Sequence, residues 1–339
     1  MTVAQWAEFN AYHARNREQA TQLWRFIVLC IGVGAMGSHV AALLAQAGCR
    51  LLLIDRDTLD YANLTRHYVT DRGLIGRPKA HALAEKLRQE VPTLQLIRGI
   101  KGDVEQMTDP ELAALVGQAS LVVGSSGRDA VDHRVNRIAR DLHLPLVVPS
   151  LWGENDVQVL GDVHVIPWHQ RERRRGACFE CLRRPTSEAP APAEAQPGAA
   201  AEVIRVASLT AEIVLALLLS DSPQFRAIMR NLDRAACYYV VPRWPPTTRA
   251  VIARARRDCA ACSTAPTIER RVPTWDTGPI RDWLIGAGLA STALWHQLVP
   301  GLDFATTLAF IGLVGLWWRD RLPSYSEAIR AVRNWWGGR

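Results

Sequence analysis

A glycine-rich loop near the N-terminus has the residue types and spacing that bind phosphate groups. Gly32, Gly34 and Gly37 form a GxGxxG pattern directly after the apolar run Phe26–Ile31. Glycines let the backbone turn tightly and approach phosphates, and the free N–H groups at the start of a following helix attract their charge. Asp55 ends the next apolar run, where a carboxylate can bind ribose hydroxyls. The pattern predicts a nucleotide site; the alternative is a tight strand–helix turn without a ligand.

Four polar residues follow Asp55 and bear on which nucleotide is bound: Asp57, Asn63, Arg66 and Lys79. A nicotinamide-dependent dehydrogenase would share the glycine loop but needs no such set. An enzyme that cleaves a triphosphate does need it, because cationic groups stabilise the charge that builds on the α-phosphate and the departing pyrophosphate. The set favours ATP over a dinucleotide. The alternative is a solvated, charged loop.

Two CxxC pairs have the spacing of a tetrahedral metal site. They are Cys178 with Cys181, and Cys259 with Cys262. Each pair can present two sulfurs to one ion, and four thiolates leave no open position, so the site predicts structural and not catalytic Zn²⁺. Structural zinc contributes about 10–16 kcal/mol in small peptides at neutral pH. Disulfides are the alternative, and the absence of a signal-peptide-like N-terminus argues against them.

The elements that must position these residues alternate along the first half of the chain. Short apolar runs predict strands at 26–31, 51–54, 94–100, 121–123 and 146–148. Helical patterns lie between the later runs at 79–90, 109–117 and 130–142, and a helix at 202–219 precedes a strand near 238–241. This alternation predicts an α/β fold with a Rossmann-like, doubly wound sheet.

The chain divides by composition into three parts. Residues 1–24 read as an N-terminal helical arm, 25–272 as the nucleotide-binding domain, and 279–339 as an apolar helical hairpin followed by an amphipathic tail. Within the domain, 185–201 is rich in Pro and Ala and has no bulky apolar residue, which predicts a flexible crossover loop.

The motifs together resemble the ThiF/MoeB family and the adenylation domains of ubiquitin-activating enzymes. The resemblance rests on GVGAMGS, LLLIDRDTLDYANLTRH and GRPKAHALAEKLRQEVP, with the cysteine pairs in the places where that family has them, and it spans roughly residues 25–262. It implies ATP- and Mg²⁺-dependent adenylation of the C-terminal glycine of a ubiquitin-like or sulfur-carrier protein, by a homodimer. Asp55 would hold the ribose, and Asn63, Arg66 and Lys79 would contact the phosphates. Arg15 or Arg17 of the arm could add a further cation.

The chain departs from this family at two places. After the fourth strand the family has a pair of aspartates, the second of which holds magnesium, and a gapless register puts Gly124 and Gly127 there. Asp129 could substitute, with Asp132 a weaker candidate. The alternative function is therefore a catalytically degenerate, nucleotide-binding docking module.

The second departure concerns thioester chemistry. Many relatives carry an acyl-accepting cysteine in the crossover loop, and residues 185–201 contain none. We expect the three cysteines outside the CxxC pairs to be buried, inert thiols: Cys30, Cys49 and Cys237. Any thioester would then form on another protein.

Charge and hydropathy bear on partners and location. A net charge of +7 suits acidic partners, but aromatic interleaving typical of single-stranded nucleic-acid binding is missing, so no nucleic acid is expected. Residues 283–318 carry one formal charge, Asp303, and tryptophans and arginines flank them. This arrangement favours membrane association through 279–339, with a soluble hairpin as the alternative. We expect a cytoplasmic body, at the cytoplasmic face of a membrane if the tail inserts.

Overall fold

A computed structural model describes residues 2–91, 96–151, 159–168, 177–182, 200–233, 236–242, 248–252 and 255–263. Two predicted segments fall outside this description. They are residues 185–199 of the crossover loop and the hairpin with its tail at 279–339. The predictions for both, including membrane association, therefore stay predictions.

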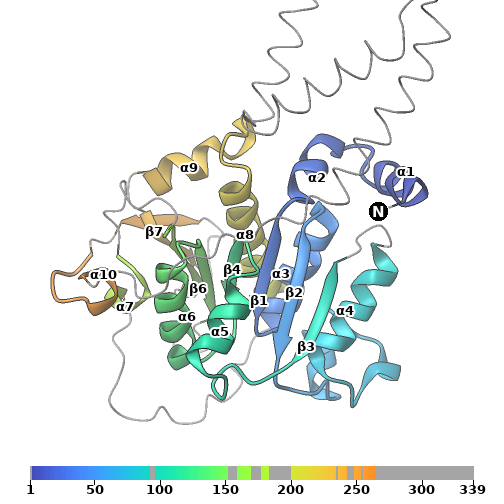
Figure 1. The fold of residues 1–339 in the computed structure, drawn as a ribbon, viewed down its shortest axis with the longest axis horizontal. Coiled ribbons are helices and arrows are strands. Elements are labelled where there is room, and N and C mark those ends of the chain that lie inside the picture. The colour runs from blue at the N-terminus through green and yellow to red at the C-terminus, as the bar shows by residue number, and fades with distance from the viewer. Residues whose placement is uncertain are drawn as a thin grey trace, which may run out of the picture. The chain divides into compact units, whose positions relative to one another are not determined.

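Strands in the described residues form one mixed sheet of eight strands, in the order β3-β2-β1-β4-β5-β6-β7-β8 (Figure 1). The first five in this order pair in parallel, and the last three continue the sheet in antiparallel pairs. The strands are β1 (Ile27–Ile31), β2 (Arg50–Asp55), β3 (Ile97–Lys101), β4 (Leu121–Gly124), β5 (Leu146–Leu151), β6 (Val159–Ile166), β7 (Ala236–Pro242) and β8 (Arg249–Ile252).

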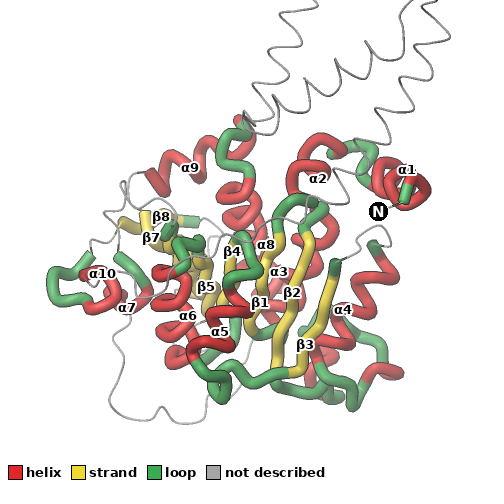
Figure 2. The backbone as a smooth tube through the Cα atoms, in the orientation of Figure 1, coloured by secondary structure: helices red, strands yellow, loops and turns green. Residues whose placement is uncertain are grey.

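Two helices precede the first strand, and most of the other helices connect the strands or pack on the sheet (Figure 2). The α-helices of the described part are α1 (Val3–Tyr12), α2 (Arg17–Leu23), α3 (Ala35–Ala47), α4 (Lys79–Glu90), α5 (Asp109–Val116), α6 (Asp129–Asp141), α7 (Phe179–Leu182), α8 (Ala200–Leu218), α9 (Arg226–Asp233) and α10 (Ala260–Ser263). Short 3-10 helices lie at η1 (Ala62–Thr65), η2 (Arg72–Leu74) and η4 (Pro223–Phe225).

The parallel strands are apolar on both faces because helices cover both faces. Side chains of β1 alternate between two hydrophobic cores. Val28 and Cys30 join the core built with α3, α4 and α8, whereas Leu29 and Ile31 join the core built with α5, α6 and the cysteine segments. Burying one such aliphatic side chain contributes about 1.5–3 kcal/mol. The near-continuous apolar runs seen in the sequence thus correspond to buried central strands.

The antiparallel half of the sheet was only partly predicted from the sequence. The expected strand near 238–241 is β7, but β6 and β8 were not predicted. In β6 the buried polar residues Asp162 and His164 interrupt the apolar pattern, and β8 is only four residues long. The fold is a mixed α/β sheet dominated by its parallel half.

The sheet has a topological switch point between β1 and β4. From β1 the chain passes through α3 to β2 on one side, while β4 pairs on the other side of β1. In open α/β sheets, ligands bind in the crevice outside the carboxyl ends of the strands at this point. The glycine loop follows β1 and the segment Ser125–Arg128 follows β4, so both loops lie at this crevice.

The N-terminal segment folds as the two helices α1 and α2. Helix α1 begins with a capping box in which Thr2 accepts from the N–H of Gln5 and the Gln5 side chain accepts from the N–H of Thr2. Phe9, Ala20 and Leu23 are buried in the same core as α3. Both helices therefore pack against the same core as the sheet. Among the helices of the described ranges, none has the length and apolar character to span a membrane.

Candidate functional site

The glycines of the loop have two different roles. Gly32 ends β1 at φ +84°, a left-handed conformation that favours glycine. A Cβ on Gly32 or Gly37 would collide with the loop after β4, at the backbone or hydroxyl of Ser125. A Cβ on Gly34, at the N-cap of α3, would meet open space. Gly32 and Gly37 thus let the two loops pack closely, and Gly34 leaves the start of α3 accessible to a phosphate.

Asp55 braces the glycine loop from the end of β2. Its carboxylate accepts the N–H of Val33 at 2.7 Å and the N–H of Asp57 at 2.8 Å. Burial raises the pKa of Asp55, and these two hydrogen bonds oppose the rise. Each carboxylate oxygen has a second acceptor position, so Asp55 can also accept from ribose hydroxyls.

His67 also binds the glycine loop, and it was not predicted from the sequence as a site residue. Its Nε2 lies 2.8 Å from the carbonyl oxygen of Val33, and its Nδ1 accepts the N–H of Val69 at 3.0 Å. Because Nδ1 is the acceptor, the ring proton is on Nε2 and is donated to Val33. Burial lowers the pKa of His67 to about 4, so the ring is neutral at physiological pH. Sequence gives no signal for this contact, because its partner lies far away along the chain.

Lys79 is buried beside Asp57 at the first turn of α4. Its Nζ lies 3.0 Å from Oδ2 of Asp57, and its N–H donates to the carbonyl of Asp57 at 2.9 Å. The side chain of Lys79 is 11% exposed and that of Asp57 is 54% exposed. Bonds from Val33 through Asp55 and Asp57 to Lys79 therefore connect the glycine loop, the carboxylate at the end of β2 and the lysine.

Asn63 and Arg66 belong to the turn around η1. Asn63 Oδ1 accepts the N–H of Asp60 at 3.2 Å, and the N–H of Asn63 donates to the Asp60 carboxylate at 2.8 Å. Arg66 is half-buried, and its carbonyl lies 3.1 Å from Nε2 of His39 on α3. The turn that carries both residues is thus tied to the helix that starts at the glycine loop.

A buried carboxylate, Asp132 in the first turn of α6, lies against the loop after β4. Asp132 is 4% exposed, and the hydroxyl of Ser126 donates to its Oδ1 at 3.3 Å. A Cβ on Gly124 would lie 3.0 Å from the same oxygen. Asp129, the first residue of α6, is exposed. Of the two acidic residues considered from sequence, the stronger candidate is accessible and the weaker one is packed behind Gly124.

The four cysteines of the CxxC pairs form one cluster. Their sulfur atoms all lie within 4.8 Å of one another, with Cys178 3.6 Å from Cys259 and Cys181 3.5 Å from Cys262. Sulfurs at the usual Zn–S distance around a tetrahedral centre would lie ~3.8 Å apart. A disulfide needs a separation of about 2 Å, and the four cysteines are free thiols.

The surroundings of the cluster also fit a structural metal. The N–H of Arg256 donates to the sulfur of Cys181 at 3.3 Å, a bond that helps to orient a thiolate ligand. Helices α7 and α10 each contain one cysteine of the cluster and directly follow another, and they lie beside one another and pack on α6 (Figure 1). The four thiol donors leave no open position and are buried apart from the half-buried Cys262, so they fit Zn²⁺ in a structural role.

The two described cysteines outside the CxxC pairs, Cys30 and Cys49, are fully buried, as predicted. Burial raises the pKa of Cys30 to about 12, which makes its thiolate unavailable. The side chain of Cys237 lies outside the described residues.

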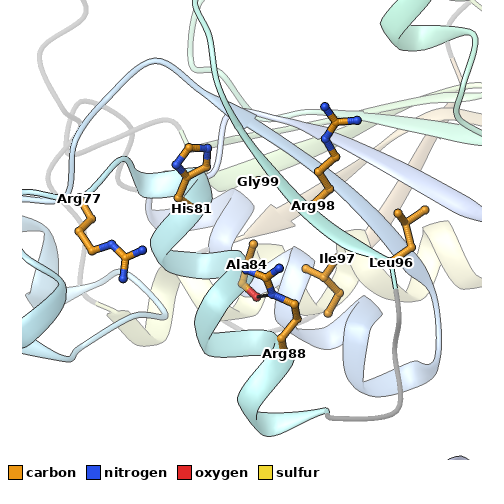
Figure 3. Close-up of a pocket in the computed structure, with 8 residues that line it drawn as sticks. All are labelled: Arg77, His81, Ala84, Arg88, Leu96, Ile97, Arg98 and Gly99. Atoms are coloured by element: carbon orange, nitrogen blue, oxygen red, sulfur yellow. Dashed lines mark hydrogen bonds between the residues drawn. The ribbon is translucent and has the colours of Figure 1, made fainter. Parts of the chain in front are cut away.

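A separate cavity of about 410 Å³ lies at the outer edge of the sheet, between α4 and β3 (Figure 3). Its polar lining is basic: Arg77, His81, Arg88 and Arg98. None of these residues belongs to the glycine loop or to the polar set that follows it.

Comparison with known proteins decides the family. The pattern of the ThiF family matches residues 10–313, most of the chain. The chain belongs to the ThiF family.

Curated relatives of this ThiF-family chain include two proteins of Escherichia coli (strain K12). The molybdopterin-synthase adenylyltransferase is 28% identical over 158 residues, which cover 46% of this chain and 58% of the relative. The sulfur carrier protein ThiS adenylyltransferase is 30% identical, over 46% of this chain and 57% of the relative. The chain thus spans less than two thirds of the length of these relatives. A SUMO-activating enzyme subunit of Caenorhabditis elegans is 25% identical over 51% of this chain and 28% of the relative.

Solved structures share the fold. The structure of E. coli MccB with ATP matches with a TM-score of 0.57 at 17% identity, covering 76% of this chain and 72% of that one. PaaA matches with a TM-score of 0.55 at 14% identity, covering 75% of each chain. At such low identity the likeness extends to the ThiF-family fold alone.

Proposed function

We propose that this ThiF-family chain binds ATP at the glycine loop and transfers AMP to the C-terminal glycine carboxylate of a ubiquitin-like or sulfur-carrier protein. The observation that carries the proposal is the connected set Val33, Asp55, Asp57 and Lys79. These contacts connect the glycine turn, the carboxylate of Asp55 and the buried side chain of Lys79, which supports a site for the phosphates and ribose of ATP. Two relatives named as adenylyltransferases support the same reaction class.

The residues divide the work by position. The N–H groups at the start of α3, left accessible at Gly34, would bind phosphate oxygens. Lys79 would leave Asp57 and stabilise charge on the phosphates, and Arg66 and Asn63 would approach from the η1 turn. Asp55 would hold the ribose while continuing to brace Val33.

Mg²⁺ is expected with ATP and would neutralise phosphate charge. Because Mg²⁺ is commonly held by one or two carboxylates together with substrate phosphates, a single protein carboxylate suffices. Asp129 is exposed at the loop after β4 and fits this role better than the buried Asp132. The cysteine cluster lies in the second core and would hold Zn²⁺ in a structural role.

The test is ATP–pyrophosphate exchange with a sulfur-carrier protein that ends in glycine. We expect exchange that depends on the carrier and is lost when its terminal glycine is removed. Binding of a nicotinamide dinucleotide that competes with ATP, without exchange, would point instead to a dehydrogenase. We expect the chain to be a cytoplasmic protein that forms a homodimer. Light scattering on the purified chain measures its oligomeric state.

A second function has one observation in its favour. Gly124 and Gly127 stand where the family resemblance leads us to expect two aspartates, so the chain could bind nucleotide and dock a partner without turnover. Tight ATP binding without pyrophosphate exchange, across several carriers, would favour this degenerate module.

A further inference from the structure

A chain of ion pairs runs along the crevice, from the start of α4 to the loop after β4. Lys79 contacts Asp57 at 3.0 Å, and Asp57 lies 3.6 Å from Nε of Arg56. Nη1 of Arg56 lies 3.4 Å from one carboxylate oxygen of Glu105, and the other oxygen lies 2.8 Å from Nε of Arg128. Cations and carboxylates therefore alternate across loops that follow β2, β3 and β4.

Arg128 stands next to a position where the family resemblance predicts negative charge. It directly follows Gly127, one of the two positions expected to be aspartate, and it is the N-cap of α6. Ser125, in the same loop, packs against Gly32 and Gly37. Relative to that pattern, this loop has glycines in place of the two carboxylates and carries a guanidinium at the next residue.

The side chain of Arg128 is not needed to shape its loop. The N–H of Arg128 donates to the hydroxyl of Ser126 at 3.1 Å, and that hydroxyl contacts Asp132. These contacts use the backbone of residue 128. The guanidinium is held by Glu105, and the two side chains are 37% and 30% exposed. Because half-exposed ion pairs are weak, a more highly charged ligand can replace Glu105 at little cost.

We propose that Arg128 is a second cation for the triphosphate, held by Glu105 until the nucleotide binds. This inference rests on the proposed ATP site and adds to it. When ATP binds, the ion pair between Lys79 and Asp57 opens and Lys79 contacts phosphate oxygens. In the same way, Arg128 leaves Glu105 and contacts phosphate oxygens. A guanidinium fits phosphate oxygens with paired donors, which favours the exchange.

The released carboxylates keep a partner. Glu105 and Asp57 both remain beside Arg56, and Arg56 is also held by Asp103 at 3.5 Å. The exchange therefore leaves no carboxylate buried without a cation. Arg56 acts as the fixed centre of the chain, and the cations at its two ends move to the ligand.

The test compares the affinities of ATP and AMP for the wild-type chain and for Arg128→Gln, Arg128→Lys and Glu105→Gln, by titration calorimetry with Mg²⁺ and again with EDTA. Arg77→Gln is the matched control, because Arg77 is a similarly exposed arginine in an ion pair with Glu85, outside the crevice. The variant Arg128→Gln should bind ATP about 10-fold more weakly than wild type, because one charged contact to the phosphates is lost. AMP binding should change less than about twofold, since AMP lacks the outer phosphates.

The other variants sharpen the result. Arg128→Lys should recover part of the lost ATP affinity, and Glu105→Gln should bind ATP more tightly than wild type because the competing carboxylate is gone. Equal ATP affinity in wild type and Arg128→Gln would overturn this inference alone. If the wild-type chain binds no ATP, both this inference and the proposed function fail.

Discussion

Asp55 and His67 both bind the backbone of the same residue of the glycine loop, Val33. The carboxylate of Asp55 accepts the N–H of Val33 at 2.7 Å, and Nε2 of His67 donates to its carbonyl at 2.8 Å. Both contacts are made within the protein itself, so they hold the turn in place for the proposed nucleotide. Such preorganisation avoids rearrangement when charge develops on the phosphates.

Removing the His67 ring should therefore destabilise the fold. His67→Ala leaves the carbonyl of Val33 and the N–H of Val69 unpaired in a buried site, and we expect a loss of about 2–4 kcal/mol in the free energy of unfolding. Urea unfolding measures it. His81→Ala, at an exposed histidine of α4, is the control and should change stability by less than about 0.5 kcal/mol. Equal effects in the two variants would contradict the role assigned to His67.

The same histidine predicts a pH dependence. Burial lowers the pKa of His67 to about 4 in the folded chain, whereas an unfolded histidine titrates near 6.5. Between these values the unfolded state binds more protons, so stability is lost as pH falls from about 6.5 to about 4, by up to about 3 kcal/mol. The measurement is the unfolding free energy against pH for wild type and for His67→Asn. The difference in unfolding free energy between wild type and His67→Asn should become smaller as the pH falls. If the two curves stay parallel, His67 is not the cause of the pH dependence.

Zinc should be bound once per chain and lost with any of its ligands. Cys178→Ser and Cys259→Ser each remove one sulfur of the cluster, and we expect loss of the metal and a melting temperature lower by roughly 10 °C. Atomic absorption and thermal unfolding check this. Cys49→Ala, at a buried cysteine outside the cluster, should keep the metal. If a reductant lowers the melting temperature but a chelator does not, the pairs are disulfides.

The two acidic residues of α6 should separate by function. Asp129→Asn should raise the Mg²⁺ concentration needed for half-maximal ATP binding about 10-fold, since one metal ligand is lost, and should change stability by less than about 1 kcal/mol. Asp132→Ala should lower stability by about 1–2 kcal/mol, because the hydroxyl of Ser126 then loses this acceptor in a buried site. Mg²⁺ titrations at fixed ATP decide it. The reverse pattern would move the metal ligand from Asp129 to Asp132.

The parallel half of the fold could be predicted from sequence because its signals are local. Strands predicted at 26–31, 51–54 and 146–148 are β1, β2 and β5 within three residues at each end. Buried parallel strands need apolar side chains on both faces, which gives continuous runs. The cysteine cluster could also be predicted, because each CxxC pair already places two ligands.

The remainder depends on contacts between distant segments. His67 meets Val33 only after the sheet has formed, and Glu105 meets Arg128 only when the loops after β3 and β4 come together. The carboxylate of Asp132, on α6, occupies the space that a side chain at Gly124, on β4, would need. No spacing rule within one segment contains this information.

The most direct test of the account is ATP binding by Lys79→Ala compared with Lys86→Ala. Both lysines are on α4 and both are paired, Lys79 with Asp57 in the crevice and Lys86 with Glu90 on the helix surface. We predict that Lys79→Ala weakens ATP binding at least about 10-fold, while the ATP affinity of Lys86→Ala stays within about twofold of the wild-type value. Equal ATP affinity for the two variants, or no ATP binding by the wild-type chain, would contradict it.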